Sequence, residues 1–120
     1  MFSGALVVES LRADTRLPDL NLTIRELYRF RPGGTAAYQP DTWSVIEFEV
    51  DDAAAPALAE TFAGALDQPG WYVDFRSPAE TFVIFPGRVF RYARGDEQGR
   101  AEAQAHGRAA GVPEHQLDWK

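Results

Sequence analysis

The chain has 120 residues, of which 45% are hydrophobic and 25% charged, and this composition is typical of a single globular domain over residues 1–120. It contains no cysteine, which excludes disulfides, thiolate nucleophiles and cysteine-ligated metals. No apolar stretch approaches the roughly 20 residues of a membrane span, and no secretion signal precedes the first expected strand. We therefore expect a soluble, cytoplasmic protein without a membrane partner.

The net charge of −6 is unevenly distributed along the chain. Residues 41–75 contain eight acidic side chains and no basic one, whereas residues 1–40 and 76–100 each contain five arginines. Pairing within the domain is the simplest interpretation of this pattern, and a docking face for a basic protein partner is the sharper one. A nucleic-acid partner is disfavoured, because contacts with phosphates usually require a basic excess.

The first part of the chain predicts two strands and a long loop. Residues 4–11 are rich in Leu and Val and favour a short strand, the weakest of those expected. Residues 22–30 alternate in character and predict a second strand, with four side chains on one face: Leu22, Ile24, Tyr28 and Phe30. The loop 31–42 has the length at which functional loops become common, although its simplest interpretation is a hairpin connection.

Residues 43–50 form the clearest predicted strand, because their side chains alternate regularly between apolar and acidic from Ile46 onward. A period of two implies one buried face and one wet face. If this strand pairs with residues 22–30, Arg25 and Arg29 lie across from Glu47 and Glu49. Such cross-strand ion pairs explain these charges without a ligand.

An alanine-rich helix is expected after Asp51 and Asp52, whose carboxylates suit the positive end of a helix. Pro56 must lie in the first turn, since a deeper position would break the hydrogen-bond ladder. Apolar side chains recur every four residues and predict a buried stripe: Leu58, Phe62 and Leu66. Residues 67–70, with the sequence Asp-Gln-Pro-Gly, end this helix.

Three further strands are expected over residues 71–75, 81–85 and 89–92, separated by turns that contain proline. A second helix follows over residues 97–110, with Asp96 as its N-cap. Its packing face is expected to be a stripe of small residues: Ala101, Ala105 and Ala109. The closing segment is expected to dock on the domain through two apolar side chains, Leu117 and Trp119.

These elements together predict an α+β fold with the order (β)ββαβββα. We expect a two-layer arrangement with a mostly antiparallel sheet of five strands, or six if residues 4–11 form one. Both helices are expected to cover the same face of this sheet. The opposite face would carry charged side chains.

Few residues carry chemistry suited to catalysis or to metal binding. His106 and His115 stand apart without a metal-binding spacing, so we expect neither a metal nor another cofactor. Asp74 follows Tyr72 by two residues, and together with Arg91 these side chains are the polar groups that a ligand pocket would use. The simpler interpretation of Asp74 is an ion pair with a nearby arginine.

Contact residues for a protein partner are sought in the acidic stretch. Glu47 and Glu49 alternate with apolar residues, so both are expected on the uncovered face of the sheet. An aromatic side chain on that face would indicate a partner surface or self-association.

Several segments resemble a group of small, uncharacterised bacterial proteins that are frequent in actinobacteria. They are Trp-Tyr-Val-Asp-Phe at 71–75, Phe-Val-Ile-Phe-Pro-Gly-Arg-Val-Phe-Arg-Tyr at 82–92, and Gly-Val-Pro-Glu-His-Gln-Leu-Asp-Trp at 111–119. The resemblance covers most of the chain. It implies no activity, cofactor or catalytic residue.

The small size, the acidity and the lack of a catalytic constellation favour a non-enzymatic module that binds or regulates another protein. The alternative is a small-molecule-binding protein or a minor enzyme, with a pocket between the sheet and the helices. The two hypotheses differ in where the binding surface lies: on the uncovered face of the sheet for the first, and in a cavity between the sheet and the helices for the second.

Overall fold

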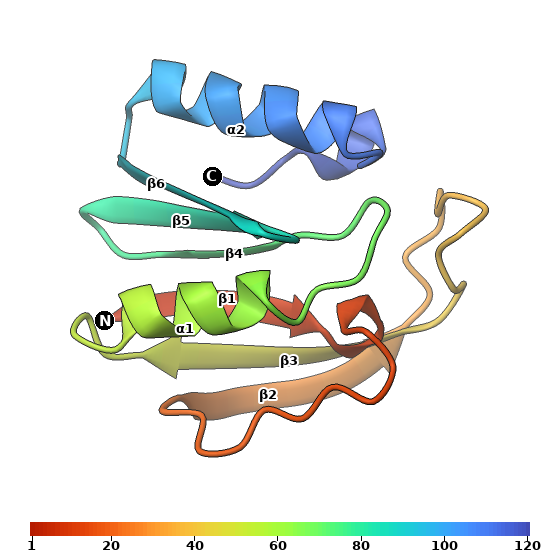
Figure 1. The fold of residues 1–120 in the computed structure, drawn as a ribbon, viewed down its shortest axis with the longest axis horizontal. Coiled ribbons are helices and arrows are strands. Elements are labelled where there is room, and N and C mark those ends of the chain that lie inside the picture. Colours follow the sequence, from red (N-terminus) through yellow and green to blue (C-terminus); the bar gives the residue numbers. More distant parts are fainter.

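The computed structural model describes all residues from 1 to 120 and contains one six-stranded antiparallel sheet with two helices (Figure 1). The elements in chain order are β1 (Phe2–Val7), β2 (Thr23–Phe30), β3 (Trp43–Val50), α1 (Ala55–Ala63), β4 (Val73–Arg76), β5 (Glu80–Phe85), β6 (Arg88–Ala93) and α2 (Glu97–Ala109). The strands lie in the order β2-β3-β1-β4-β5-β6. The α+β class and the predicted order of elements are confirmed.

Strand β1 lies in the middle of the sheet, between β3 and β4. It is the weakest of the predicted strands, and it forms earlier than expected, at Phe2–Val7, before a 3₁₀ turn at Val8–Ser10. The Ser10 hydroxyl donates to the carbonyl oxygen of Val7 at 2.6 Å and stabilises this turn. Non-local pairing with two neighbours stabilises this strand, which local sequence pattern alone indicates weakly.

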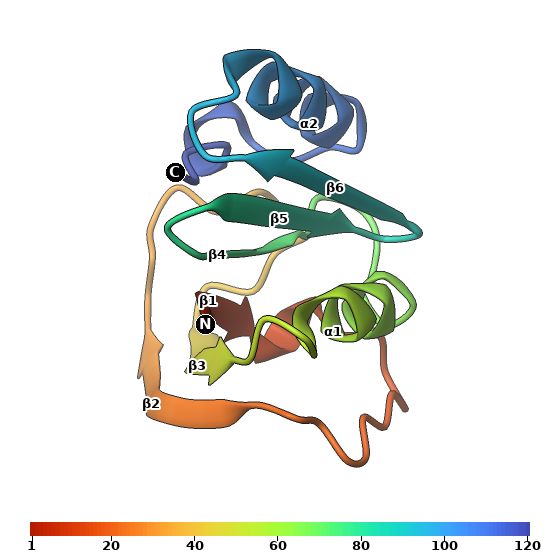
Figure 2. The same ribbon diagram turned by 90° about the vertical axis from the view of Figure 1, so that its left-hand side faces the viewer.

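The two helices pack against opposite faces of β5. Phe82 and Ile84 belong to the core under α1, whereas Val83 and Phe85 belong to the core under α2. Because successive side chains of a strand point to opposite faces, α1 and α2 lie on different sides of the sheet, as Figure 2 shows. The expectation that both helices share one face therefore needs correction: β5 is apolar on both faces, and each face requires its own cover.

Helix α1 covers β1, β3 and β4, and α2 with the C-terminal segment covers β5 and β6 from the other side. The side of β2, β3, β1 and β4 that points away from α1 therefore has no helix over it. We call this side the open face. Ser3 and Ala5 are exposed there even though β1 is a central strand.

A β-bulge changes which residues of β2 reach the open face. The register with β3 shifts between Ile24 and Glu26, with Arg25 as the extra residue. Tyr28 and Phe30 consequently lie on the open face, whereas Ile24 points to the side of α1. The prediction that Ile24, Tyr28 and Phe30 share one face is wrong for this reason.

Helix α2 packs through a different stripe from the predicted one. Ala103 and Gly107 are buried, whereas Ala101, Ala105 and Ala109 are exposed. A Cβ atom on Gly107 would lie 2.9 Å from a Leu117 methyl carbon and 3.0 Å from the Phe85 ring, so glycine permits this close approach. The Asp96 side chain accepts a hydrogen bond from the Gly99 amide at 3.0 Å, as its N-cap role predicts.

Neither helix is long and apolar enough to cross a membrane.

Candidate functional site

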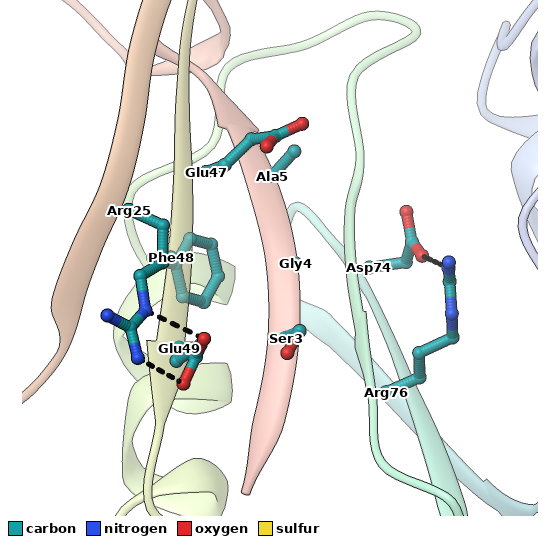
Figure 3. A pocket seen from close by; sticks show the side chains of 9 residues that line it. All are labelled: Ser3, Gly4, Ala5, Arg25, Glu47, Phe48, Glu49, Asp74 and Arg76. Carbon is teal, nitrogen blue, oxygen red and sulfur yellow. Dashed lines mark hydrogen bonds and ion pairs between the residues drawn. The ribbon is translucent and has the colours of Figure 1, made fainter.

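A shallow groove runs along the open face above strand β1. Its floor is formed by the short side chains of Ser3 and Ala5, with longer side chains of β3 and β4 on either side (Figure 3). Ala5 pairs directly with Glu47 on β3 and with Asp74 on β4. Small residues on the middle strand β1 thus leave a hollow of about 350 Å³, with Glu47 on the β3 side and Asp74 on the β4 side.

On the β3 side of the groove, Arg25 and Glu49 form an ion pair with good hydrogen-bond geometry. The Arg25 guanidinium donates two hydrogen bonds to Glu49, at 2.7 and 3.2 Å. This side-chain hydrogen bond holds the pKa of the Glu49 carboxyl below its usual range. Because the pair is exposed to solvent, its main effect is to position Glu49. Glu47 receives only a long hydrogen bond of 3.5 Å from the Tyr28 hydroxyl.

On the β4 side of the groove lies Asp74, whose carboxylate is 3.6 Å from the Arg76 guanidinium. Burial raises the pKa of Asp74 to about 6, against the opposing attraction of Arg76, and the nearby Asp118 carboxylate raises it further. The Asp74 side chain retains 24% exposure, so it is reachable from solvent. Asp74 is therefore a solvent-accessible carboxylate whose negative charge is only partly compensated by Arg76.

The groove continues at Ala5 and Asp74 into a second hollow of about 330 Å³, which we call the aromatic cavity. Its aromatic walls are Trp43, Trp71 and Tyr72, and its polar walls include Asp74, Asp118 and His115. The rings of Trp43 and Trp71 are in contact, with centroids 5.3 Å apart. No lysine or arginine lines this cavity.

Tyr72 connects the cavity to the core under α2. Its ring packs on Trp119 and Phe85, with centroids 5.1 and 5.9 Å apart. Its hydroxyl donates a hydrogen bond to the carbonyl oxygen of Gln116. Burial, together with the Asp74 and Asp118 charges, raises the pKa of Tyr72 well above its usual range, so the phenol stays neutral. Tyr72 is therefore a fixed wall of the cavity.

The loop 31–42 forms the outer wall of the aromatic cavity. Pro32 and Gly33 line it. The buried Gln39 exchanges two side-chain hydrogen bonds with Gln116, at 3.1 and 3.0 Å, and Tyr38 donates to the carbonyl oxygen of Gly111. The loop joins two paired strands, as a hairpin connection does, and these contacts fasten it to the C-terminal segment.

Four of the five predicted site residues lie on the open face, and the fifth does not. Tyr72, Asp74, Glu47 and Glu49 line the groove or the aromatic cavity. Arg91 pairs with Phe82, which faces α1, and its guanidinium binds Glu80 at 2.5 and 2.9 Å. Asp74 stands opposite Val83 and so points to the other side of the sheet. The strand register thus separates Arg91 from the proposed pocket.

Only Tyr72 and Asp74 of the residues that line the aromatic cavity were predicted as site residues from the sequence. His115 and Asp118 come from the C-terminal segment, and no local pattern places that segment over the open face. Trp43 was identifiable in principle, because it has the same strand parity as Glu47 and Glu49. No group of three or more acidic or histidine side chains is arranged to hold a metal ion.

Comparison with family models, with curated proteins and with solved structures finds no match to this chain.

Proposed function

We propose that this protein is a non-enzymatic binding module that docks a basic protein partner on the open face of its sheet. The observation that carries the proposal is a four-stranded surface without a helix over it, hollowed along its centre and rich in carboxylates. Cytoplasmic action in a regulatory role fits this proposal and the absence of cysteine.

Charge complementarity identifies the chemistry of the partner. The open face carries five carboxylates: Glu26, Glu47, Glu49, Asp74 and Asp118. Its two arginines, Arg25 and Arg76, are both next to carboxylates of the same face. An acidic excess remains, and it attracts a basic surface and suppresses acidic competitors.

The open face also carries a row of aromatic side chains, which are a second feature of protein interfaces besides complementary charge. Tyr28, Phe30, Trp43 and Trp71 form a continuous row of ring contacts, with centroids 5.8, 6.2 and 5.3 Å apart. Phe30 is 40% exposed although it is a large apolar residue. Tyrosine and tryptophan are enriched among the residues that dominate binding energy at interfaces.

The test is site-specific photo-crosslinking in the native host. A photoreactive residue replaces Ser3 in the groove or, as the control, Ala101 on the exposed side of α2. A protein captured from Ser3 alone is purified and titrated with the unmodified chain and with a Glu26→Lys/Glu47→Lys variant. We expect binding to weaken by about tenfold or more. A Glu97→Lys/Glu102→Lys variant on α2 has the same charge change and should bind normally. Equal capture from both positions, or equal binding by all variants, would overturn the proposal.

The aromatic cavity favours a second candidate, a small-molecule-binding protein. Its volume of about 330 Å³ is within the range of roughly 300–1,000 Å³ that ligand pockets show. It lies between the sheet and the C-terminal segment, beside Tyr72 and Asp74 and away from Arg91. Thermal-shift screening with small metabolites distinguishes this candidate. A metabolite that stabilises the chain, and loses its effect in an Asp74→Asn variant, supports it.

A further inference from the structure

We propose that the aromatic cavity receives a single arginine side chain of the partner, with the guanidinium between the indole rings and the two aspartates. This inference rests on the proposed function, since it names the group through which a basic partner is recognised. It follows from the composition of the cavity walls rather than from the charge of the open face as a whole.

The cavity combines two features that each favour an organic cation. Aromatic rings line it, from Trp43, Trp71 and Tyr72, and the electron-rich face of such a ring attracts a cation. Its carboxylates, from Asp74 and Asp118, lie near enough to repel each other, since the Asp118 charge adds to burial in raising the pKa of Asp74. A bound cation relieves this repulsion.

No lysine or arginine lines the cavity and supplies that cation. Asp74 forms an ion pair with Arg76 at 3.6 Å, and Arg76 lies in the adjoining groove. At this distance Arg76 makes no direct hydrogen bond with the Asp74 carboxylate. The carboxylate therefore keeps acceptor capacity for a donor that enters from solvent.

Arginine fits this site better than lysine. A planar guanidinium stacks on aromatic rings and donates several hydrogen bonds in one plane, so it contacts the indoles and both carboxylates at once. The ammonium group of lysine is a compact, strongly hydrated charge that loses more hydration in such a site. The two aspartates come from different elements, β4 and the C-terminal segment, which suits a donor with several N–H groups.

The test uses the full chain and a minimal probe, Nα-acetyl-arginine methylamide, followed by NMR. Two indole N–H signals, from Trp43 and Trp71, report on the cavity. The third, from Trp119, is an internal reference because its Nε1 donates to the Tyr92 hydroxyl within the core. We expect the first two signals to shift with a Kd on the order of 1–10 mM and the third to shift less.

Matched probes and variants show whether binding depends on the guanidinium charge of the probe and on the two aspartates of the cavity. The citrulline analogue has the same shape without the charge and should not shift the signals, and the lysine analogue should bind more weakly. An Asp74→Asn/Asp118→Asn variant should bind the arginine probe about tenfold more weakly, whereas a Glu97→Gln/Glu102→Gln variant should bind it normally. Equal shifts with citrulline and arginine, or no shift with arginine, would overturn the inference.

This experiment is independent of the test of the proposed function. If a partner crosslinks to the groove but the arginine probe does not bind, the proposed docking face is supported and the arginine site is contradicted. If the probe binds but no protein crosslinks, the cavity is a site for a free guanidinium compound and the proposed protein partner is contradicted.

Discussion

Ala5 and Asp74 are direct cross-strand neighbours, and both line the groove and the aromatic cavity. Ala5 is exposed on a strand that has neighbours on both sides, so its small side chain leaves the two hollows connected. A larger side chain at this position would separate them without disturbing the core under α1.

The first prediction concerns this connection. An Ala5→Leu substitution should leave the melting temperature nearly unchanged, because the new side chain points to solvent, and it should weaken binding of the partner and of the arginine probe. An Ala101→Leu substitution on the exposed side of α2 adds the same group elsewhere and should leave both unchanged. The comparison uses calorimetry and the NMR titration. Normal binding by Ala5→Leu contradicts the proposed site.

The second prediction concerns pH. The pKa of Asp74 is raised from an ordinary value near 3.8 to about 6 in the folded chain, so the folded state binds an extra proton between these values. The contribution of this group to stability is therefore lost as pH rises from about 4 to about 6, by roughly 1–2 kcal/mol after allowance for its partial exposure. An Asp74→Asn variant should be more stable than the parent at pH 7 and similar to it below pH 4.

The groups around Asp74 that also carry or acquire charge are Asp118, Arg76, Glu47, Tyr72 and His115. Denaturant unfolding at several pH values, with Asp118→Asn as the comparison, separates the contribution of Asp74 from theirs. A difference between parent and Asp74→Asn that is the same at pH 4 and at pH 7 contradicts the assignment.

The third prediction concerns the packing of α2. A Gly107→Ala substitution should destabilise the protein by about 1–2 kcal/mol, because overpacking against Phe85 and Leu117 exceeds the gain in helix propensity. Gly64 at the end of α1 is the matched control. A Cβ atom there meets its nearest neighbours at an ordinary 3.6 Å, so Gly64→Ala should be nearly neutral. Chemical denaturation of both variants measures the difference.

The fourth prediction concerns the two faces of the sheet. An Arg91→Gln substitution breaks an exposed pair with Glu80 on the side of α1, so it should change stability little and partner binding not at all. Glu47→Gln removes a charge from the groove and should weaken partner binding, most clearly at low salt. A binding defect in Arg91→Gln would show that the contact surface is not the open face.

Much of the local structure follows from the sequence for identifiable reasons. The alternation over residues 43–50 predicts β3 with its Glu47 and Glu49 face, and the spacing of Leu58 and Phe62 predicts the buried side of α1. Asp96 begins α2 as its position indicates. These features depend on neighbours along the chain, which share a strand face or a helix face by geometry alone.

Other features required contacts that local patterns do not specify. The bulge at Arg25 reverses the face of Ile24 relative to Tyr28, and a shift of one residue is invisible in an alternation this irregular. The choice of Gly107 over the neighbouring alanines as the packing surface depends on the shapes of Phe85 and Leu117, which approach it from other elements.

The sequence alone therefore determined the class of fold, the order of its elements, the acidity of the chain and the absence of cysteine chemistry. The tertiary structure decided that α1 and α2 take opposite faces of the sheet, because β5 is apolar on both sides. That arrangement leaves the open face uncovered, and the strand register places Asp74 on this face and Arg91 on the other. It also brings the C-terminal segment beside Trp43 and Trp71 to form a cavity whose parts lie more than seventy residues apart in the chain.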